Sequence, residues 1–184
     1  MLTAKQIIKA GIVTLSEENK EKYEIDLAPA QMGIDLHMIS CAKFIEDPDN
    51  TGAIYSDKQD KKTKIPTTEP MKPVSDKSDK TAYYWLLTPG EYEIGFAEGC
   101  KFTGKTAGKI VHRSSVRRCG GEINSPLWDP GFYTNEMGTF LSVKHPMKIY
   151  VGARVAQMLV WKSTREAKKY NGQWQGTGVL NGKH

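Results

Sequence analysis

The sequence predicts an all-β domain, a barrel or a sandwich, preceded by a short helix. Short strand-like runs recur at close spacing along most of the chain, and Gly and Pro residues mark turns between them, which is typical of such folds. With 184 residues and a hydrophobic fraction of 39%, the chain is most simply one domain that is large enough to bury its own core.

The N-terminal helix is expected over residues 3–10. Thr3 can cap its first turn, and Gly11 can end it. Residues 16–24, which follow, are rich in charged side chains and are expected to be exposed.

Residues 34–38 alternate apolar with polar side chains, the period of a half-buried strand. In that strand Asp35 points away from the face of its apolar neighbours, so the simplest expectation is a solvent-facing residue. Residues 46–80 differ, because they are rich in Asp, Lys, Thr, Ser and Pro and hold few large apolar side chains. We interpret them as a long excursion that is partly ordered at best.

Strand-like sequence returns at Tyr83. A turn signal at residues 88–91 separates two apolar stretches, and further strands are expected around residues 140–143 and 155–161. Residues 166–184 are polar and rich in Gly, so they are expected to form a flexible arm unless another part of the protein pins them.

Charge and cysteine usage narrow the class of protein. The formal net charge of +5 suits nucleotides or another anionic partner, but the lysines are spread along the chain, so nucleic acid is not the expected partner. No apolar run is long enough to span a membrane, and the N-terminal sequence is too polar for a signal peptide. Cys41, Cys100 and Cys119 are an odd and widely spaced set, which favours a reducing cytoplasm over a disulfide framework.

The strongest chemical signals lie in residues 113–131, which read RSSVRRCGGEINSPLWDPG. Arg113 can bind two phosphate oxygens, and the hydroxyls of Ser114 and Ser115 add donors. Asp129 lies in an Asp-Pro-Gly turn and is a candidate general base, and we expect a β-hairpin between the two motifs. Taken alone, the Arg-Ser-Ser motif is explained at least as well as a solvated surface turn. Asp129 is likewise explained at least as well as an ordinary turn-forming residue.

Other features are open to two interpretations. Gln157 lies between apolar runs and is either a structural amide or a ligand contact. Gly172, Gly176 and Gly178 either wrap phosphates with backbone N–H groups or belong to a simple polar tail. The sequence lacks the zinc motifs of nucleoside deaminases, a Walker A motif and a GxGxxG, which excludes those chemistries.

The order of the motifs carries more information than any one of them. It resembles the motif order of the dUTPase and dCTP deaminase superfamily, and is most similar to archaeal-type dUTPases built on the deaminase-like scaffold. The segments that carry the resemblance are GIDL at 33–36, LLTPGEY at 86–92, RSS at 113–115, WDPGF at 128–132, RVAQ at 154–157 and the Gly-rich tail.

The resemblance implies a distorted β-barrel or jelly-roll-like fold that assembles as a homotrimer, with active sites between subunits and a C-terminal arm that closes over them. It implies hydrolysis of dUTP to dUMP and pyrophosphate with magnesium. In this sequence Asp129 would activate the water, Ser114 would bind the oxygen that bridges the α- and β-phosphates, and Arg113 would steady the assembly. Gln157 would contact phosphate from a neighbouring subunit, and Asp35 would support the metal through water.

The resemblance also implies a set of substrate contacts. Phe132 would pack on the deoxyribose, and the tail would bring Tyr170 and Gln175. The remaining implied contacts are Ser115, Arg118, Gly121, Asn124, Ser125 and Leu127, of which the last four lie in the segment whose backbone would read the base.

Deamination of dCTP, alone or beside dUTP hydrolysis, is the alternative chemistry. The deaminase branch has a Glu ten residues after the Asp of the WDPG-like motif, where this chain has Thr139, and the nearest acid is Glu136. Arg118 does match an arginine of the deaminase site. A non-catalytic module that senses a nucleotide or binds a partner is a third possibility, which the excursion at residues 46–80 favours.

Overall fold

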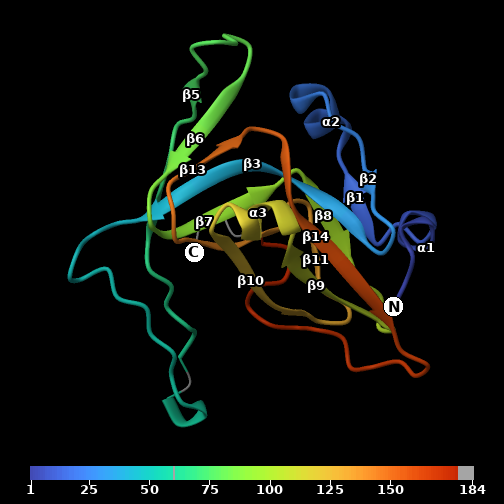
Figure 1. Cartoon of the computed structure of the whole chain (residues 1–184). Helices are drawn as coiled ribbons and strands as arrows, with labels where there is room; N and C mark the ends of the chain where they lie inside the picture. Colours follow the sequence, from blue (N-terminus) through green and yellow to red (C-terminus); the bar gives the residue numbers. More distant parts are fainter. Residues whose placement is uncertain (60, 178–184) are drawn as a thin grey trace.

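The fold is a closed barrel of six strands in the order β14-β9-β10-β12-β7-β3, and pairing of β14 with β3 closes it (Figure 1). The computed structural model describes residues 1–59 and 61–177. The predicted all-β class is therefore confirmed. The barrel strands are β3 (Ile34–Phe44), β7 (Gly90–Phe96), β9 (Thr106–His112), β10 (Gly121–Trp128), β12 (Gly138–Val143) and β14 (Ala153–Lys162).

Shorter strands extend the barrel and form two small sheets beside it. β2 (Ala28–Pro29) and β4 (Thr68–Pro70) pair with β3. One small sheet contains β1 (Val13–Leu15), β8 (Glu98–Lys101) and β11 (Tyr133–Thr134). The other contains β5 (Val74–Ser75), β6 (Tyr83–Leu87) and β13 (Met147–Tyr150), and it projects from the barrel (Figure 1).

The chain begins with two short helices, of which the sequence predicted the first and not the second. α1 (Ala4–Lys9) confirms the first predicted helix, and Thr3 and Gln6 form the reciprocal bonds of a capping box. The sequence prediction missed α2 (Glu17–Tyr23), where only an exposed charged segment was expected. Ser16 caps this helix, and Asn19 is buried because its amide donates to the carbonyl of Ala97 at 3.0 Å.

β3 is buried on both faces, whereas the alternation predicted one solvated face. Asp35 and His37 are 5% and 6% exposed, so the expectation of a solvent-facing Asp35 is wrong. Glu98 of β8 covers His37, with 2.5 Å between Glu98 Oε1 and His37 Nδ1. Gly33 precedes the strand with φ +90, and a Cβ there would lie 2.4 Å from the carbonyl oxygen of Met158. The close approach of β14 therefore requires glycine at this position.

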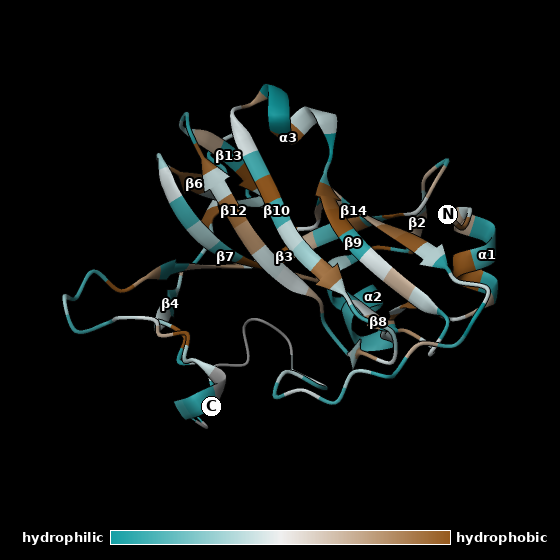
Figure 2. Ribbon diagram, turned by 90° about the horizontal axis from the view of Figure 1, so that it is seen from below, coloured by the Kyte–Doolittle hydropathy of each residue, from teal (hydrophilic) through white to brown (hydrophobic). Residues whose placement is uncertain are grey.

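The segment between Arg113 and Asp129 is a short helix and one strand, whereas a hairpin was expected there. α3 (Ser114–Arg118) is followed directly by β10, along which hydrophobic and hydrophilic residues alternate (Figure 2). β10 does form a hairpin, but with β12, which follows Asp129. The Asp-Pro-Gly turn therefore lies in the loop of that hairpin.

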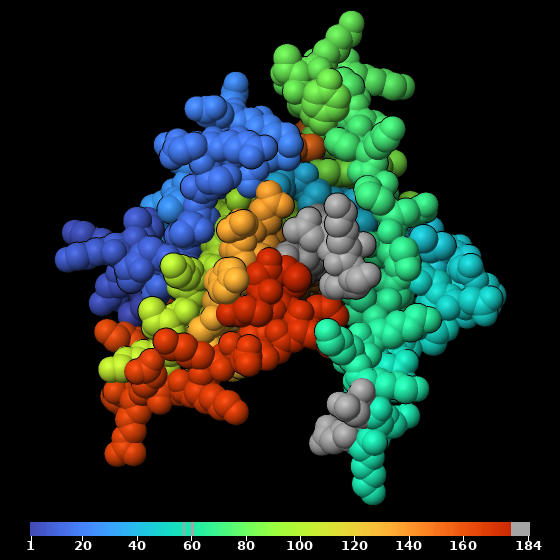
Figure 3. Space-filling model, turned by 180° about the vertical axis from the view of Figure 1, so that it is seen from behind, coloured from blue at the N-terminus to red at the C-terminus, as the bar shows by residue number. Residues whose placement is uncertain are grey.

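The excursion and the tail are both attached to the barrel. Residues 46–80 contain β4, β5 and a 3-10 helix, η1 (Asp57–Gln59). The tail is pinned where the backbone N–H of Ala167 donates to Gly104 and that of Tyr170 donates to Pro130, each at 2.7 Å. Figure 3 shows the tail in red across one face of the molecule. Residues 178–184, Gly178 included, lie outside the described residues.

Candidate active site

The first part of the site is a charged cluster around Asp35. The Nε of Arg113 lies 3.4 Å and the Nη1 of Arg154 lies 3.5 Å from Asp35 Oδ2, and the amide of Gln157 donates to Asp35 Oδ1 at 3.5 Å. Two guanidinium groups against one carboxylate leave a net positive charge. The cluster is therefore prepared for an anion.

α3 places hydroxyl groups beside this cluster. Arg113 is the residue before the helix, and its backbone N–H donates to Val155 of β14 at 2.9 Å, which fixes the start of α3 to the barrel. Ser114 follows and is exposed. A cavity of about 600 Å³ opens here, and its lining includes Asp35, Arg113, Ser114 and Gln157. We call this cavity the phosphate pocket.

The second part of the site is built on the turn at Asp129. The backbone N–H of Phe132 donates to the carbonyl of Asp129 at 3.1 Å, and Pro130 and Gly131 are the central residues of the turn. Gly131 has φ +83, as required at the third position of a type II turn. A Cβ at Gly131 would lie 2.6 Å from Cβ of Lys169, so glycine also lets the tail approach.

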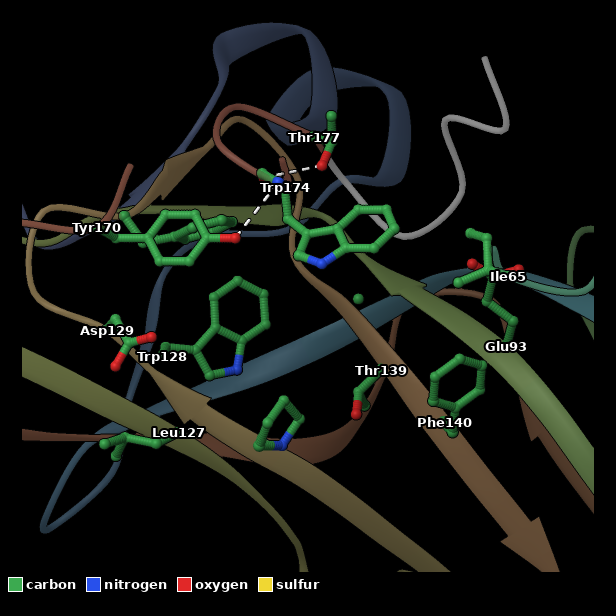
Figure 4. Close-up of a pocket in the computed structure, with 13 residues that line it drawn as sticks. Ile65, Glu93, Leu127, Trp128, Asp129, Thr139, Phe140, Tyr170, Trp174 and Thr177 are labelled. Carbon is green, nitrogen blue, oxygen red and sulfur yellow. Dashed lines mark hydrogen bonds between the residues drawn. The ribbon is translucent and has the colours of Figure 1, made fainter. Parts of the chain in front are cut away.

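Aromatic side chains line a cavity beside the exposed Asp129. Phe132 makes edge contacts with Trp128 and Tyr170, with ring centroids 5.2 and 5.5 Å apart. Together with Trp174 they line a cavity of about 450 Å³, in which Figure 4 shows the tail residues above and Asp129 at one side. We call this cavity the aromatic pocket.

The aromatic pocket opens where two barrel strands part. β10 and β12 are paired from Gly121 with Val143 to Asn124 with Phe140, and the pairing then stops. Beyond Asn124, β10 is irregular and continues only with β9. Pro126 of β10 and Thr139 of β12 line the pocket on the two sides of this gap, which we call the slot.

The tail forms the roof of the aromatic pocket within the same chain. The side-chain amide of Gln175 donates to the carbonyl of Gly131 at 2.9 Å, and the backbone N–H of Trp174 donates to the hydroxyl of Tyr170 at 3.3 Å. Among the described residues, Gln175 Oε1 is buried and has no hydrogen-bond partner. This acceptor is costly to leave unsatisfied unless a ligand or another group completes it.

α3, whose first residue Ser114 lines the phosphate pocket, and the turn at Asp129, which lines the aromatic pocket, lie at opposite ends of β10; Figure 2 shows α3 at one end of this strand. α3 packs at Gly121, where the strand begins, and Asp129 follows its last residue, Trp128. An extended strand of eight residues spans roughly 20 Å or more at about 3.3 Å per residue. Within one chain, Ser114 and Asp129 are therefore too far apart to contact the same atom of a ligand.

Of the other predicted contacts, Leu127 lines a pocket, whereas the linings of the two pockets do not include Ser115, Arg118, Gly121, Asn124 or Ser125. Ser115 and Arg118 are exposed on α3, and Leu127 lines the aromatic pocket with 57% of its surface exposed. Ser125 is 3% exposed, and its hydroxyl oxygen accepts from the indole of Trp128 and the backbone N–H of Ile110. Ser125 thus serves the internal structure of β10.

Several lining residues were not predicted. Arg154 was overlooked although it lies three residues before Gln157 in the same motif. Glu93 alternates with Glu91, so nothing in the sequence distinguished it from an exposed strand residue. Glu136, the nearest acid to the expected deaminase position, accepts from the amide of Asn19 at 3.0 Å and does not line the aromatic pocket.

The described residues do not form a metal site whose ligands all come from the protein. Within residues 1–59 and 61–177, no three or more His, Cys, Asp or Glu side chains are grouped to hold a metal ion. Asp35 is bound by two guanidinium groups, so its carboxylate fits an outer contact to a hydrated ion better than a direct metal bond.

A comparison with known protein families identifies the class to which this fold belongs. The profile of the dCTP deaminase-like family matches residues 3–163, so the chain belongs to this family. The predicted resemblance is thereby confirmed. No helix among the described residues is long and apolar enough to cross a membrane.

The chain has relatives in sequence, and it shares its fold with a solved structure. A probable deoxyuridine 5′-triphosphate nucleotidohydrolase of Halobacterium salinarum is 33% identical over 106 residues, which are 58% of this chain and 62% of that protein. A protein of the same name from Methanosarcina mazei is 27% identical over 175 residues, 93% of this chain and 92% of the relative. The 2′-deoxycytidine 5′-triphosphate deaminase of Agrobacterium tumefaciens shares the fold with a TM-score of 0.55 at 14% identity, over 88% of this chain and 47% of that one.

Proposed function

We propose that the protein is a dUTP diphosphatase, which hydrolyses dUTP to dUMP and pyrophosphate. The observation that carries the proposal is the position of Asp129 at the side of an aromatic pocket that reaches the slot between β10 and β12. Probable dUTP nucleotidohydrolases among the relatives support the same activity. Thr139 stands in the slot where the deaminase branch has its Glu, and this favours hydrolysis over deamination.

The active site would be assembled from two subunits, and a homotrimer closes such a set of identical contacts. The phosphate pocket of one subunit would face the aromatic pocket of its neighbour. The length of β10 supports this assembly, because the two pockets of one chain are too far apart. Exposed Leu127 and Phe140 at the aromatic pocket would be covered by the neighbour.

In the assembled site the substrate would lie with its base in the slot and its deoxyribose on Phe132. Asp129 would accept a proton from the water that attacks the α-phosphorus, and pyrophosphate would leave. Ser114 would donate to the oxygen bridging the α- and β-phosphates, and Arg113 would neutralise the charge that develops there. Gln157 would contact phosphate from the same side as Arg113.

Magnesium would enter with the triphosphate. When it is bound, the ion neutralises part of the phosphate charge, and Asp35 would contact it through water. Arg113 and Arg154 keep Asp35 in place for this contact, since both guanidinium groups bind its carboxylate.

The tail would close the site during turnover. Tyr170 already packs on Phe132, and a tail in this position excludes bulk water from the reacting phosphate. The buried Oε1 of Gln175 would gain a donor in the complete site. A reducing cytoplasm is the proposed setting, and the three cysteines are unpaired thiols.

The deciding experiment is to incubate the protein and magnesium with each deoxynucleoside triphosphate and to identify the products. We expect dUMP and pyrophosphate from dUTP. Rapid ammonia release from dCTP would replace the proposal with a deaminase, and binding without any product would replace it with a nucleotide sensor.

A further inference from the structure

The charged cluster around Asp35 depends on an irregularity in β14. Arg154 and Gln157 are three residues apart, so in a regular strand their side chains would point to opposite faces of the sheet. Both nevertheless contact Asp35, each at 3.5 Å. The register between β14 and β3 shifts after Arg154, which leaves Val155 as the extra residue of a β-bulge. The bulge therefore turns Arg154 and Gln157 to the same side.

The same bulge holds the start of α3. The backbone N–H of Arg113 donates to the carbonyl of Val155 at 2.9 Å, and Nη1 of Arg113 donates to the carbonyl of Arg154 at 3.3 Å. The phosphate pocket thus takes its charged groups from a segment that keeps its shape only while the bulge stays in register. A slip of one residue would turn the side chains of β14 to the other face.

Glu98 of β8 binds β3 directly opposite the bulge. His37 is the partner of Arg154 in the pairing of β3 with β14, and its backbone N–H donates to Glu98 Oε2 at 3.0 Å. The other carboxyl oxygen, Oε1, lies 2.5 Å from Nδ1 of the same histidine. Glu98 is 0% exposed and lines neither pocket, so its carboxyl group does not contact the substrate itself.

β3 needs this support because it is irregular on its other edge as well. Its pairing with β7 shifts between Met38 and Ser40. His37 therefore lies between two bulges, and the chain at the start of β8 holds it from outside the barrel ladder. The backbone N–H of Ala97 donates to the carbonyl of His37 at 3.0 Å, beside the two contacts of Glu98. We call these three contacts the His37 clamp.

We propose that Glu98 is a positioning residue for the phosphate pocket, and that it acts through His37. The clamp keeps β3 in the register that the bulge of β14 requires. Arg154 and Gln157 then both remain on Asp35. The inference rests on the proposed function, in which this pocket binds the phosphates of the substrate.

The test measures the two pockets separately by calorimetry in the presence of magnesium. Pyrophosphate probes the phosphate pocket, and deoxyuridine probes the aromatic pocket. Glu98→Leu removes both acceptors of the clamp, so we expect pyrophosphate affinity to fall by about tenfold or more, the size of one hydrogen bond to a charged group. The affinity for deoxyuridine should not change. Glu98→Gln keeps an acceptor for the backbone N–H of His37 and should restore most of the pyrophosphate affinity.

Thr134→Val is the matched control. Thr134 is 4% exposed and pairs with Cys100 of β8, so it belongs to the same small sheet as Glu98. Its hydroxyl donates to the carbonyl of Glu136 at 2.8 Å and not to β3. This variant should lower the melting temperature and leave pyrophosphate affinity at the wild-type value.

Two results overturn the role of Glu98. One is wild-type pyrophosphate affinity in folded Glu98→Leu, and the other is an equal loss for pyrophosphate and deoxyuridine, which would indicate general damage to the fold. If Glu98→Leu does not fold, Glu98→Asp decides, because its carboxyl group is withdrawn by one methylene. Wild-type pyrophosphate affinity in Glu98→Asp would then overturn the proposal.

The outcomes also separate this inference from the proposed function. A wild-type protein that binds pyrophosphate but hydrolyses no dUTP would refute the diphosphatase and leave the comparison of Glu98 variants intact. Normal pyrophosphate binding by the variants, together with hydrolysis of dUTP by the wild type, would refute the role of Glu98 alone. No binding of pyrophosphate by the wild type would refute the phosphate pocket and the positioning role together.

Discussion

Mixing two inactive variants tests whether the site is shared between subunits. Asp129→Asn removes the proposed base from the aromatic pocket, and Ser114→Ala removes a donor from the phosphate pocket. Both side chains are exposed, so each variant should fold. If every site takes Asp129 from one subunit and Ser114 from the next, a mixed assembly contains sites in which both residues are wild type.

The expected recovery follows from the geometry of a closed trimer. In a trimer that contains both variants, one of the three sites receives an intact Asp129 and an intact Ser114, so the purified mixed trimers should show about one third of wild-type activity. A site within one chain would recover nothing, because every chain carries one defect. The assay is pyrophosphate release from dUTP by co-expressed variants purified through two different tags, after subtraction of each variant alone. Mixed assemblies with no recovered activity would refute the shared site.

Three further predictions concern single features of the molecule. Asp129→Asn should lower kcat for dUTP on the order of 10²-fold or more with an unchanged melting temperature, and a loss of only a few-fold would exclude Asp129 as the base. Truncation after Glu166 should leave a folded barrel with reduced turnover, because the arm closes the pocket and adds little to the core; normal turnover by the truncated protein would exclude a role for Tyr170 and Gln175. Hydrogen bonds from Tyr150 and Ser78 hold the pKa of Asp76 below its usual value, so Tyr150→Phe should destabilise the protein at pH 7 and progressively less as the pH falls below about 3.9. Urea unfolding at pH 7 and pH 3 measures this, and an equal loss at both values would contradict it.

Local sequence signals predicted the elements whose ends or faces are marked by residues close together in the chain. α1 was predicted because Thr3 and Gly11 mark its ends. α2 was missed because its charged sequence has no apolar stripe, and the cap at Ser16 was not recognised without one. Alternation located β3, but it could not show that Arg113 and Arg154, far along the chain, would cover Asp35.

The candidate site was predictable where a residue's role depends on its own motif. Asp129 was singled out by its Asp-Pro-Gly turn and Phe132 by the family resemblance, and both residues line the aromatic pocket. Glu93 was not found, because its place in the pocket depends on the gap between β10 and β12 and on Thr68 from the excursion. Periodicity in one strand carries no information about such long-range neighbours.

The proposed division of the site between two pockets has an electrostatic reason. In the proposed mechanism the Asp129 carboxylate acts beside a triphosphate, and like charges repel strongly in a site from which water is excluded. Arg113 and Arg154 supply positive charge, but in one chain they lie at the far end of β10 from Asp129. The proposed assembly, which places the phosphate pocket of one subunit against the aromatic pocket of another, would bring this charge to the substrate. An isolated subunit could then hold the base and sugar, yet it would lack the groups that make attack at the α-phosphorus favourable.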